Sequence, residues 1–337
     1  MIKVLYKIYQ KYDKKKYDNI ITRKFASIPQ YAMDALNSYT KKIDLIDFKK
    51  SKCYQFTWES VNVELTFFSV SKEKLHSKDA IALISFYITI LNFHIHKTRT
   101  LKIILVPFKN TKQLPFKTDI ISSEHANSGY SNGSYIFIYR EEEMFKVLIH
   151  EMIHYYDIDF KDTHYDEYFV KKYNIRPTKT QLRIFESYTD ILAIFLSSFA
   201  YICFSESDDA IKYSEIKFIK KYLYILDAVR ENVLQTASNI MAHYNCDSFC
   251  GFEEKTHIFS YYICKAALMY NYHNFLSWLG KDIVMHNKTE RIKEYVEHLD
   301  AYLSHKGFQE AINLRLSKQP RNTSLRMFMF KIKGMET

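Results

Sequence analysis

The sequence predicts an α+β fold, in which a small sheet with helices is followed by a mainly helical C-terminal domain. Glycine and proline are scarce, at 6 and 5 of 337 residues, which favours long helices over the many tight turns of an all-β protein. Strand patterns occur only before residue 141. From residue 208 to about residue 316 the pattern is almost wholly helical.

Three strands are expected in the first half of the chain. Residues 61–67 alternate apolar and polar side chains, as a half-buried strand does. Residues 101–107 form a continuous apolar run, which Pro107 is expected to end. Residues 134–140 follow two turn signals that contain asparagine and glycine, and they complete the expected sheet.

Long apolar segments predict helices between and after these strands. The first helix is expected over residues 78–94. The second is expected over 141–156, with three glutamates in its first turn, where the helix dipole favours acidic side chains. Residues 157–180 are expected to form a polar loop, and the third helix follows over 181–205.

The basic, aromatic-rich composition has two explanations. Lysine and arginine number 48 against 38 acidic residues, a formal charge of +10, and the chain has 28 tyrosines and 25 phenylalanines. A basic surface with aromatic side chains is typical of nucleic-acid-binding proteins. Lysine, tyrosine and phenylalanine are also what an AT-rich genome encodes, for example that of a large DNA virus. We favour the second explanation, because the basic residues are scattered and no nucleic-acid-binding motif is present.

Neither the cysteines nor the apolar segments indicate a secreted or membrane protein. Five cysteines in a chain of this length do not form a disulfide framework. Residues 1–10 lack the apolar stretch and cleavage site of a signal peptide. The most apolar stretches, 80–95 and 191–204, are shorter than the roughly 18–20 residues that span a bilayer. We therefore expect no membrane span and a cytoplasmic location, in the host cytoplasm or the virion if the source is a virus.

The strongest indication of function is the segment His150-Glu151-Met152-Ile153-His154. Two histidines four residues apart lie on one helix face, so both imidazoles can reach one metal ion. Glu151 is rotated by about 100° from His150, where it can accept a proton from water on the metal. Zn²⁺ suits this set, because it accepts nitrogen and carboxylate ligands tetrahedrally. The rest of the helix is apolar, and buried histidine and glutamate would be costly there without a metal ion.

A catalytic zinc site needs a third protein ligand and leaves its fourth position to water. Glu186 is the best candidate, because it lies 32 residues after His154 on the next long helix. Asp190, one turn later, can accept the free ring N–H of a ligating histidine and so orient it. His164 is an alternative ligand.

H-E-x-x-H followed on a later helix by E-x-x-x-D resembles the motif of the gluzincins, zinc metallopeptidases typified by thermolysin and neprilysin. The resemblance covers residues of about 80–200 in the order of their elements, and it is specific in the motifs. It implies that His150, His154 and Glu186 bind one catalytic Zn²⁺. It also implies that Glu151 is the general base and that Asp190 orients His150.

The chain departs from some branches of the zinc peptidases. Phe185 stands where many gluzincins have asparagine before the third ligand, and the Gly-x-Met-Glu-Asn motif of one aminopeptidase branch is absent. These departures leave the subfamily open. A metzincin is disfavoured, because Asp157 and Phe160 stand where that family has glycine and its third histidine.

The resemblance also implies where a substrate would lie. Gluzincins align the substrate along an edge strand just before the active-site helix, and residues 127–139 occupy that place here. The backbone of this segment could pair with an extended peptide. The candidate substrate-binding residues are Asn127, Gly129 and Tyr130.

A donor facing the developing oxyanion is expected from the C-terminal region, where gluzincins generally use histidine or tyrosine. His257 and Tyr261 are four residues apart and share a helix face, and Tyr262 is a further candidate. His257 also belongs to a group whose residue types suit structural zinc, although its spacing matches no familiar module. That group is His243, Cys246, Cys250 and His257.

The sequence thus predicts a zinc-dependent peptidase that hydrolyses peptides or proteins. Its expected parts are a mixed α/β segment (1–75), a zincin-like catalytic core (76–206), a helical C-terminal domain (207–316) and a solvated basic tail (317–337). The alternative is a non-catalytic basic protein that binds nucleic acid or a protein partner and carries a structural or degenerate metal site.

Overall fold

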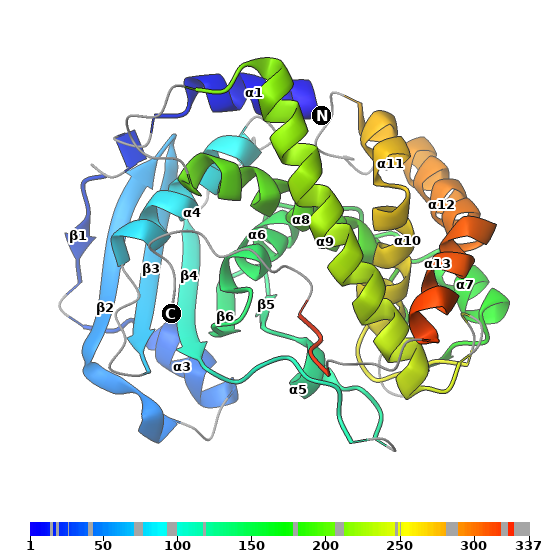
Figure 1. Ribbon diagram of the computed structural model, residues 1–337. Helices are drawn as coiled ribbons and strands as arrows, with labels where there is room; N and C mark the ends of the chain where they lie inside the picture. Colours follow the sequence, from blue (N-terminus) through cyan, green and yellow to red (C-terminus); the bar gives the residue numbers. More distant parts are fainter. Residues whose placement is uncertain are drawn as a thin grey trace.

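The computed structural model shows a mixed α+β protein with a six-stranded sheet and many helices (Figure 1). The coarse fold class expected from the sequence is therefore confirmed. The structure describes residues 1–13, 16–17, 20–25, 27–39, 43–70, 77–92, 100–116, 119–177, 181–205, 212–246, 249, 251–280, 289–317 and 323–326.

The sheet is mixed, and its strand order is β1-β2-β3-β4-β6-β5. Its strands are β1 (Arg23–Lys24), β2 (Asp47–Trp58), β3 (Val61–Ser69), β4 (Leu101–Phe108), β5 (Gly129–Ser131) and β6 (Ile136–Arg140). The strands β3, β4 and β6 are parallel, whereas β1, β2 and β3 pair antiparallel. β5 pairs antiparallel with β6 and forms an edge of the sheet.

Helices cover the sheet and make up most of the second half of the chain. The chain up to residue 205 contains α1 (Ile2–Lys11), α3 (Gln30–Tyr39), α4 (Ser77–Asn92), α5 (Ser123–Ala126), α6 (Met144–Tyr155), α7 (Asp166–Lys172) and α8 (Phe185–Ser205). The second half contains α9 (Glu215–His243), the π-helix η2 (Phe259–Cys264), α10 (Lys265–Tyr270), α11 (Tyr272–Leu279), α12 (Thr289–Leu303) and α13 (Lys306–Leu316). In Figure 1 the sheet lies on one side and α9 to α13 on the other, with α6 and α8 between them.

Both faces of the central strands are covered. Along β4, Ile103 and Leu105 belong to the large buried cluster that includes α4, α6 and α8, whereas Ile104 and Val106 belong to a smaller cluster under α3. A strand that is buried on both faces is apolar at nearly every position. This explains why its sequence is a continuous apolar run and not an alternating one.

Helix α8 is the central helix of the molecule. It is apolar on nearly all sides, and it packs against α6, α9 and α10. Among the described residues, α8 is the one helix that is long and apolar enough to cross a membrane. However, 94% of its most apolar 18-residue stretch is buried inside the protein. Glu186 and Asp190 on this helix are buried too, so their carboxylates need partners of opposite charge.

The start of α6, the helix that carries His150 and His154, differs from the expected one. α6 begins at Met144, so the three glutamates that were expected in its first turn precede it. Glu143 occupies the N-cap in a left-handed conformation with φ 59°. Its carboxylate lies 2.8 Å from the ammonium of Lys112 and is nearly inaccessible to solvent. A buried ion pair, and not the helix dipole, is therefore its main partner.

Other expected boundaries are also corrected. Pro107 does not end β4, which continues to Phe108, although the pairing with β6 becomes irregular there because proline has no N–H to donate. The expected polar loop over 157–180 contains α7 and the short strand β7 (Arg176–Pro177), which pairs with β8 (Glu253–Glu254). α7 forms because Phe169 is buried on its inner face.

The tail is not wholly solvated, contrary to expectation. Leu325 is fully buried, and its N–H donates to the carbonyl of Lys112 at 2.9 Å. The rest of the tail, at 318–322 and 327–337, lies outside the described residues.

The largest buried cluster extends from Leu5 in α1 to Ile312 in α13, so the sheet and the helical half share one core. The segment boundaries given above stay predictions.

Candidate metal centre

The packing of α6 against α8 brings two histidines and a glutamate together. The Nε2 atoms of His150 and His154 are 3.0 Å apart, and Oε2 of Glu186 lies 3.4 Å and 3.2 Å from them. Ligand atoms that bind a metal tetrahedrally at about 2.0–2.1 Å lie about 3.3 Å from one another. This group could therefore hold a metal ion, and it is the one such group among the described residues.

Each histidine is held by a carboxylate on its other ring nitrogen. Nδ1 of His150 donates to Asp190 at 3.1 Å, and Nδ1 of His154 donates to Asp159 at 2.7 Å. These bonds place the proton on Nδ1 and leave Nε2 of each ring to bind a metal ion. The structure thus brings Asp190 to His150, as the resemblance implies, and adds Asp159, which the sequence analysis missed.

The cluster stabilises positive charge between its side chains. Burial opposes ionisation, yet His154 and His150 hold the pKa of Glu186 well below its ordinary value. Burial also opposes charge on His150, but hydrogen bonds to Asp190 and Glu186 raise its pKa. For His154, Glu186 and Asp159 outweigh burial and raise the pKa well above the ordinary value. A divalent cation would supply the positive charge that these carboxylates favour.

Glu151 lies beside the cluster without belonging to the ligand group. Its side chain is buried, at 6% exposed, and it lines a cleft together with His150 and His154. Burial raises the pKa of its carboxyl, although the two histidines lower it. A general base works best when its pKa lies near the operating pH, so a raised pKa suits proton transfer by Glu151.

This cleft is large enough for a peptide segment. Its volume is about 760 Å³, within the range of roughly 300–1,000 Å³ that is typical of ligand sites. It is bordered by β5, by α6, by the start of α8 and by residues 255–257 and 261. The expected substrate-binding residues Asn127, Gly129 and Tyr130 all lie along it.

The edge strand β5 lies close to α6 because of Gly129. A Cβ atom at this position would lie 2.8 Å from the carbonyl oxygen of Phe137 and 3.2 Å from Val147 of α6, so a larger residue would push β5 away. The side chain of Tyr130 packs against the cluster under α3, and its hydroxyl lies 3.3 Å from that of Tyr135. Tyr130 therefore offers the cleft mainly its backbone.

Two of the three candidate oxyanion donors line the cleft, namely Tyr261 and His257. The Tyr261 ring lies 6.1 Å from the ring of His150 and 5.8 Å from that of His257. Burial, and then the carboxylate of Glu186, raise the pKa of Tyr261 well above its ordinary value, so its hydroxyl stays protonated. Tyr261 belongs to the π-helix η2, and π-helical turns are frequent at functional sites.

Burial lowers the pKa of His257, which favours the neutral form of its ring. Its Nδ1 has no hydrogen-bond partner within the described part of the chain. Tyr262, the third candidate donor, lines a smaller neighbouring pocket and not the cleft. Tyr261 is therefore the best-placed donor and His257 the second.

Among the described residues, none of the alternative metal ligands joins the cluster of His150, His154 and Glu186. His164 is exposed, and its ring lies 5.3 Å from that of Tyr165. In the second metal group, Nε2 of His243 lies 2.9 Å from the carbonyl oxygen of Asp119, and Cys250 lies outside the described residues.

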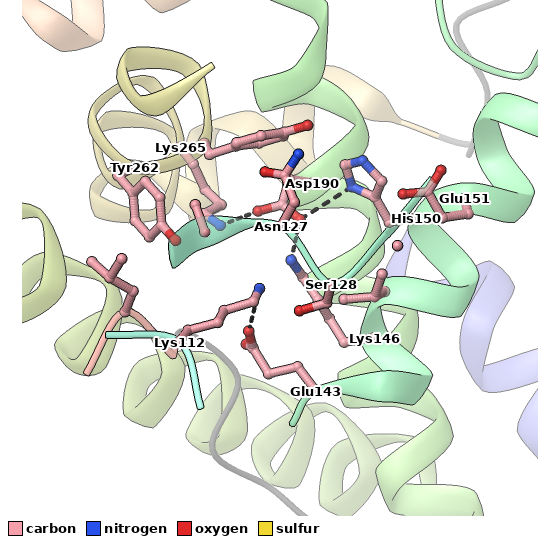
Figure 2. Close-up of a pocket in the computed structure, with 15 residues that line it drawn as sticks. Lys112, Asn127, Ser128, Glu143, Lys146, His150, Glu151, Asp190, Tyr262 and Lys265 are labelled. Atoms are coloured by element: carbon pink, nitrogen blue, oxygen red, sulfur yellow. Dashed lines mark hydrogen bonds and ion pairs between the residues drawn. The ribbon is translucent and has the colours of Figure 1, made fainter. Parts of the chain in front are cut away.

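Sequence reasoning missed three buried lysines near the site (Figure 2). Lys146 and Lys265 both pair with Asp190, and Lys112 pairs with Glu143. Lys146 lies one turn before His150, on the same face of an apolar helix. A lysine in this position was a signal in the sequence from which its burial could have been predicted. Lys112 and Lys265 are distant in sequence, and no spacing links them to the motif.

Comparison with known protein families, curated proteins and solved structures finds no match to this chain. Its chemistry is therefore inferred from its own residues. The geometry of His150, His154 and Glu186 bears most directly on that inference.

Proposed function

We propose that the protein is a zinc-dependent peptidase of the gluzincin type, with a zincin-like catalytic region and one catalytic Zn²⁺. The observation that carries this proposal is the convergence of His150, His154 and Glu186 beside Glu151 in one cleft. The edge strand β5 borders the same cleft, and an extended peptide could pair with it. In a peptide paired with β5, the bond to be cleaved would lie over the metal ligands and Glu151, the proposed general base.

The donor set fits zinc. Two imidazole nitrogens and one carboxylate oxygen are a common ligand set of catalytic zinc, which keeps its fourth position open. The three ligand atoms lie 3.0–3.4 Å apart, as a tetrahedral site requires. When bound there, Zn²⁺ would lower the pKa of a water molecule and polarise the scissile carbonyl.

In the proposed mechanism Glu151 carries the proton. Its carboxylate takes a proton from the attacking water and gives it to the nitrogen of the leaving amine. The water oxygen bonds to the carbonyl carbon and the C–N bond breaks, so one acid and one amine are released. Asp190 and Asp159 hold the two imidazoles in one tautomer throughout, through the bonds to Nδ1.

Tyr261 and β5 complete the site. Tyr261 lines the cleft, and its protonated hydroxyl would donate to the oxyanion that develops on the carbonyl, with His257 as a second donor. The backbone of residues 129–131 would hold the substrate extended across the active-site helix. Each of these roles belongs to a group that already lines the cleft.

Zinc removal tests the proposal. The purified protein is expected to cleave members of a peptide library, to lose this activity on dialysis against a chelator, and to regain it with Zn²⁺ but not with Mg²⁺, which prefers six oxygen ligands. Mass spectrometry of the products would give the cleavage sites. Cleavage that survives complete zinc removal would contradict the proposal. Failure of the zinc-loaded protein to cleave any peptide would favour the non-catalytic alternative.

A further inference from the structure

A small pocket branches from the cleft beside Glu151 (Figure 2). The pocket and the cleft share Asn127, Gly129, His150, Glu151 and Tyr261 in their walls. The pocket has a volume of about 40 Å³. A water molecule needs roughly 10–15 Å³ on this measure, so the pocket has room for about three water-sized atoms. A carboxyl group has three heavy atoms and would fill it.

Three lysines from separate segments line this pocket. Lys112 precedes α5, Lys146 lies on α6 and Lys265 begins α10, and their side chains are 8%, 5% and 2% exposed. Lysine is almost never buried to this degree unless it is paired. Figure 2 shows all three side chains directed toward the same space.

The paired carboxylates are fewer than the lysines. Lys112 pairs with Glu143, but Lys146 and Lys265 both pair with the single carboxylate of Asp190. In Figure 2 the Glu151 carboxylate lies on the far side of His150 from Lys265. The Lys146–Asp190–Lys265 group therefore has two amino groups for one directly paired carboxylate. Burial lowers the pKa of Lys265 to about 7, Lys146 adds to this effect and Asp190 opposes it, so a second carboxylate beside Lys265 would favour its charged form.

A neutral donor lines the same pocket. The side chain of Ser128 is buried, and its hydroxyl has no hydrogen-bond partner among the described residues. Buried polar groups are nearly always hydrogen-bonded, so an orphaned hydroxyl beside ammonium groups indicates a ligand that accepts hydrogen bonds. A carboxylate accepts from both kinds of donor.

We propose that this pocket binds a carboxylate of the substrate, on the residue that contributes the nitrogen of the cleaved bond. The assignment rests on the proposed peptidase function, and it names the substrate class, which is acidic peptides. Glu151 borders both the cleft and the pocket, and it delivers its proton to the leaving nitrogen. The residue that carries this nitrogen therefore lies nearest the pocket entrance. Lys146 and Lys265 share one carboxylate, that of Asp190. The carboxylate of the substrate would be a second partner for them.

A binding experiment tests the pocket without relying on cleavage. Two fluorescent peptides that differ only in glutamate or glutamine at one position are titrated onto the zinc-loaded Glu151→Gln variant, and their anisotropy is measured. The glutamate peptide is expected to bind about 10- to 100-fold more tightly, the range for a charged hydrogen bond. Adding Lys265→Met is expected to remove this preference. Asp190 then keeps Lys146 as its partner, so the fold should persist.

The control variant is Lys171→Met, which removes the same charge from an exposed position on α7 and should leave the preference intact. If Lys265→Met does not fold, Lys265→Gln serves in its place. A second pair of peptides identifies the source of the carboxylate. Both peptides end one residue after the cleavage site, one with a free C-terminal acid and the other with a C-terminal amide. Preference for internal glutamate assigns the side chain, and preference for the free acid assigns the C-terminus.

Equal binding of glutamate and glutamine peptides, and of acid and amide peptides, would overturn the carboxylate pocket, whether or not the wild type cleaves peptides. A preference that persists in the Lys265→Met variant would overturn it as well. If the acidic peptides bind preferentially but the zinc-loaded wild type cleaves none of them, the peptidase proposal fails and the carboxylate pocket stands. The two proposals can therefore fail separately.

Discussion

Replacing Glu151 by glutamine is expected to lower peptide cleavage by about 10²- to 10⁴-fold, the range that a general base contributes. Glutamine keeps the size of the side chain but cannot accept a proton from water. Because Glu151 is not among the metal ligands, the zinc content should equal that of the wild type. Cleavage rates on a peptide found by library screening, together with metal analysis of the same samples, measure both effects.

A matched control for this substitution is Glu167→Gln. Glu167 lies on α7, where it is 86% exposed and pairs with Lys171, and it is not among the residues that line the cleft. It should leave both cleavage and zinc content unchanged, since surface ion pairs contribute little. Undiminished cleavage by the Glu151→Gln variant would show that another group accepts the proton, and the mechanism above would be wrong.

Replacing Asp190 by asparagine is expected to lower the free energy of unfolding by about 3–5 kcal/mol, the cost of breaking a buried ion pair by removing one partner. Asp190 is 3% exposed, and it is the shared partner of Lys146, Lys265 and His150. Asparagine would leave two buried ammonium groups without a countercharge. Urea unfolding, followed by circular dichroism, measures the change.

Two further variants separate this effect from general damage. Asp157→Asn removes a carboxylate that is 39% exposed and pairs with Lys161, and asparagine tolerates the left-handed backbone at this position, so the loss should not exceed about 1 kcal/mol. Combining Asp190→Asn with Lys265→Met should recover part of the lost stability, because one of the two unpaired charges is gone. Equal stability of the Asp190→Asn variant and the wild type would show that the lysines do not depend on this carboxylate.

Local spacing made the central residues of the site predictable. His150 and His154 lie four residues apart, so one helix face carries both, and this holds in any fold that keeps the helix. Glu186 and Asp190 stand out because they are the two charged residues of a helix that is otherwise uncharged and mostly apolar. Three strands of the sheet were predictable for a similar reason, since each is buried along most of its length.

Residues that depend on tertiary contacts could not be predicted. The strand β2 was missed because exposed lysines fill its first half and only its second half is buried. Asp159 reaches His154 because the chain reverses at Asp157, whose φ of 53° is left-handed. Aspartate adopts this conformation more often than most residues do, but an aspartate in the sequence does not by itself predict it. Lys265 meets Asp190 across 75 residues of sequence, through the packing of α10 against α8.

The zinc content of the purified protein tests the central claim most directly. Inductively coupled plasma mass spectrometry is expected to find one Zn²⁺ per chain in the wild type and almost none in the His150→Ala and Glu186→Ala variants, because two remaining ligands hold zinc weakly. His243→Ala, which alters only the alternative group, should keep its zinc. Two results would contradict a catalytic metal centre at His150, His154 and Glu186. One is a wild type that holds no zinc after loading, and the other is zinc that stays undiminished in His150→Ala but is lost in His243→Ala.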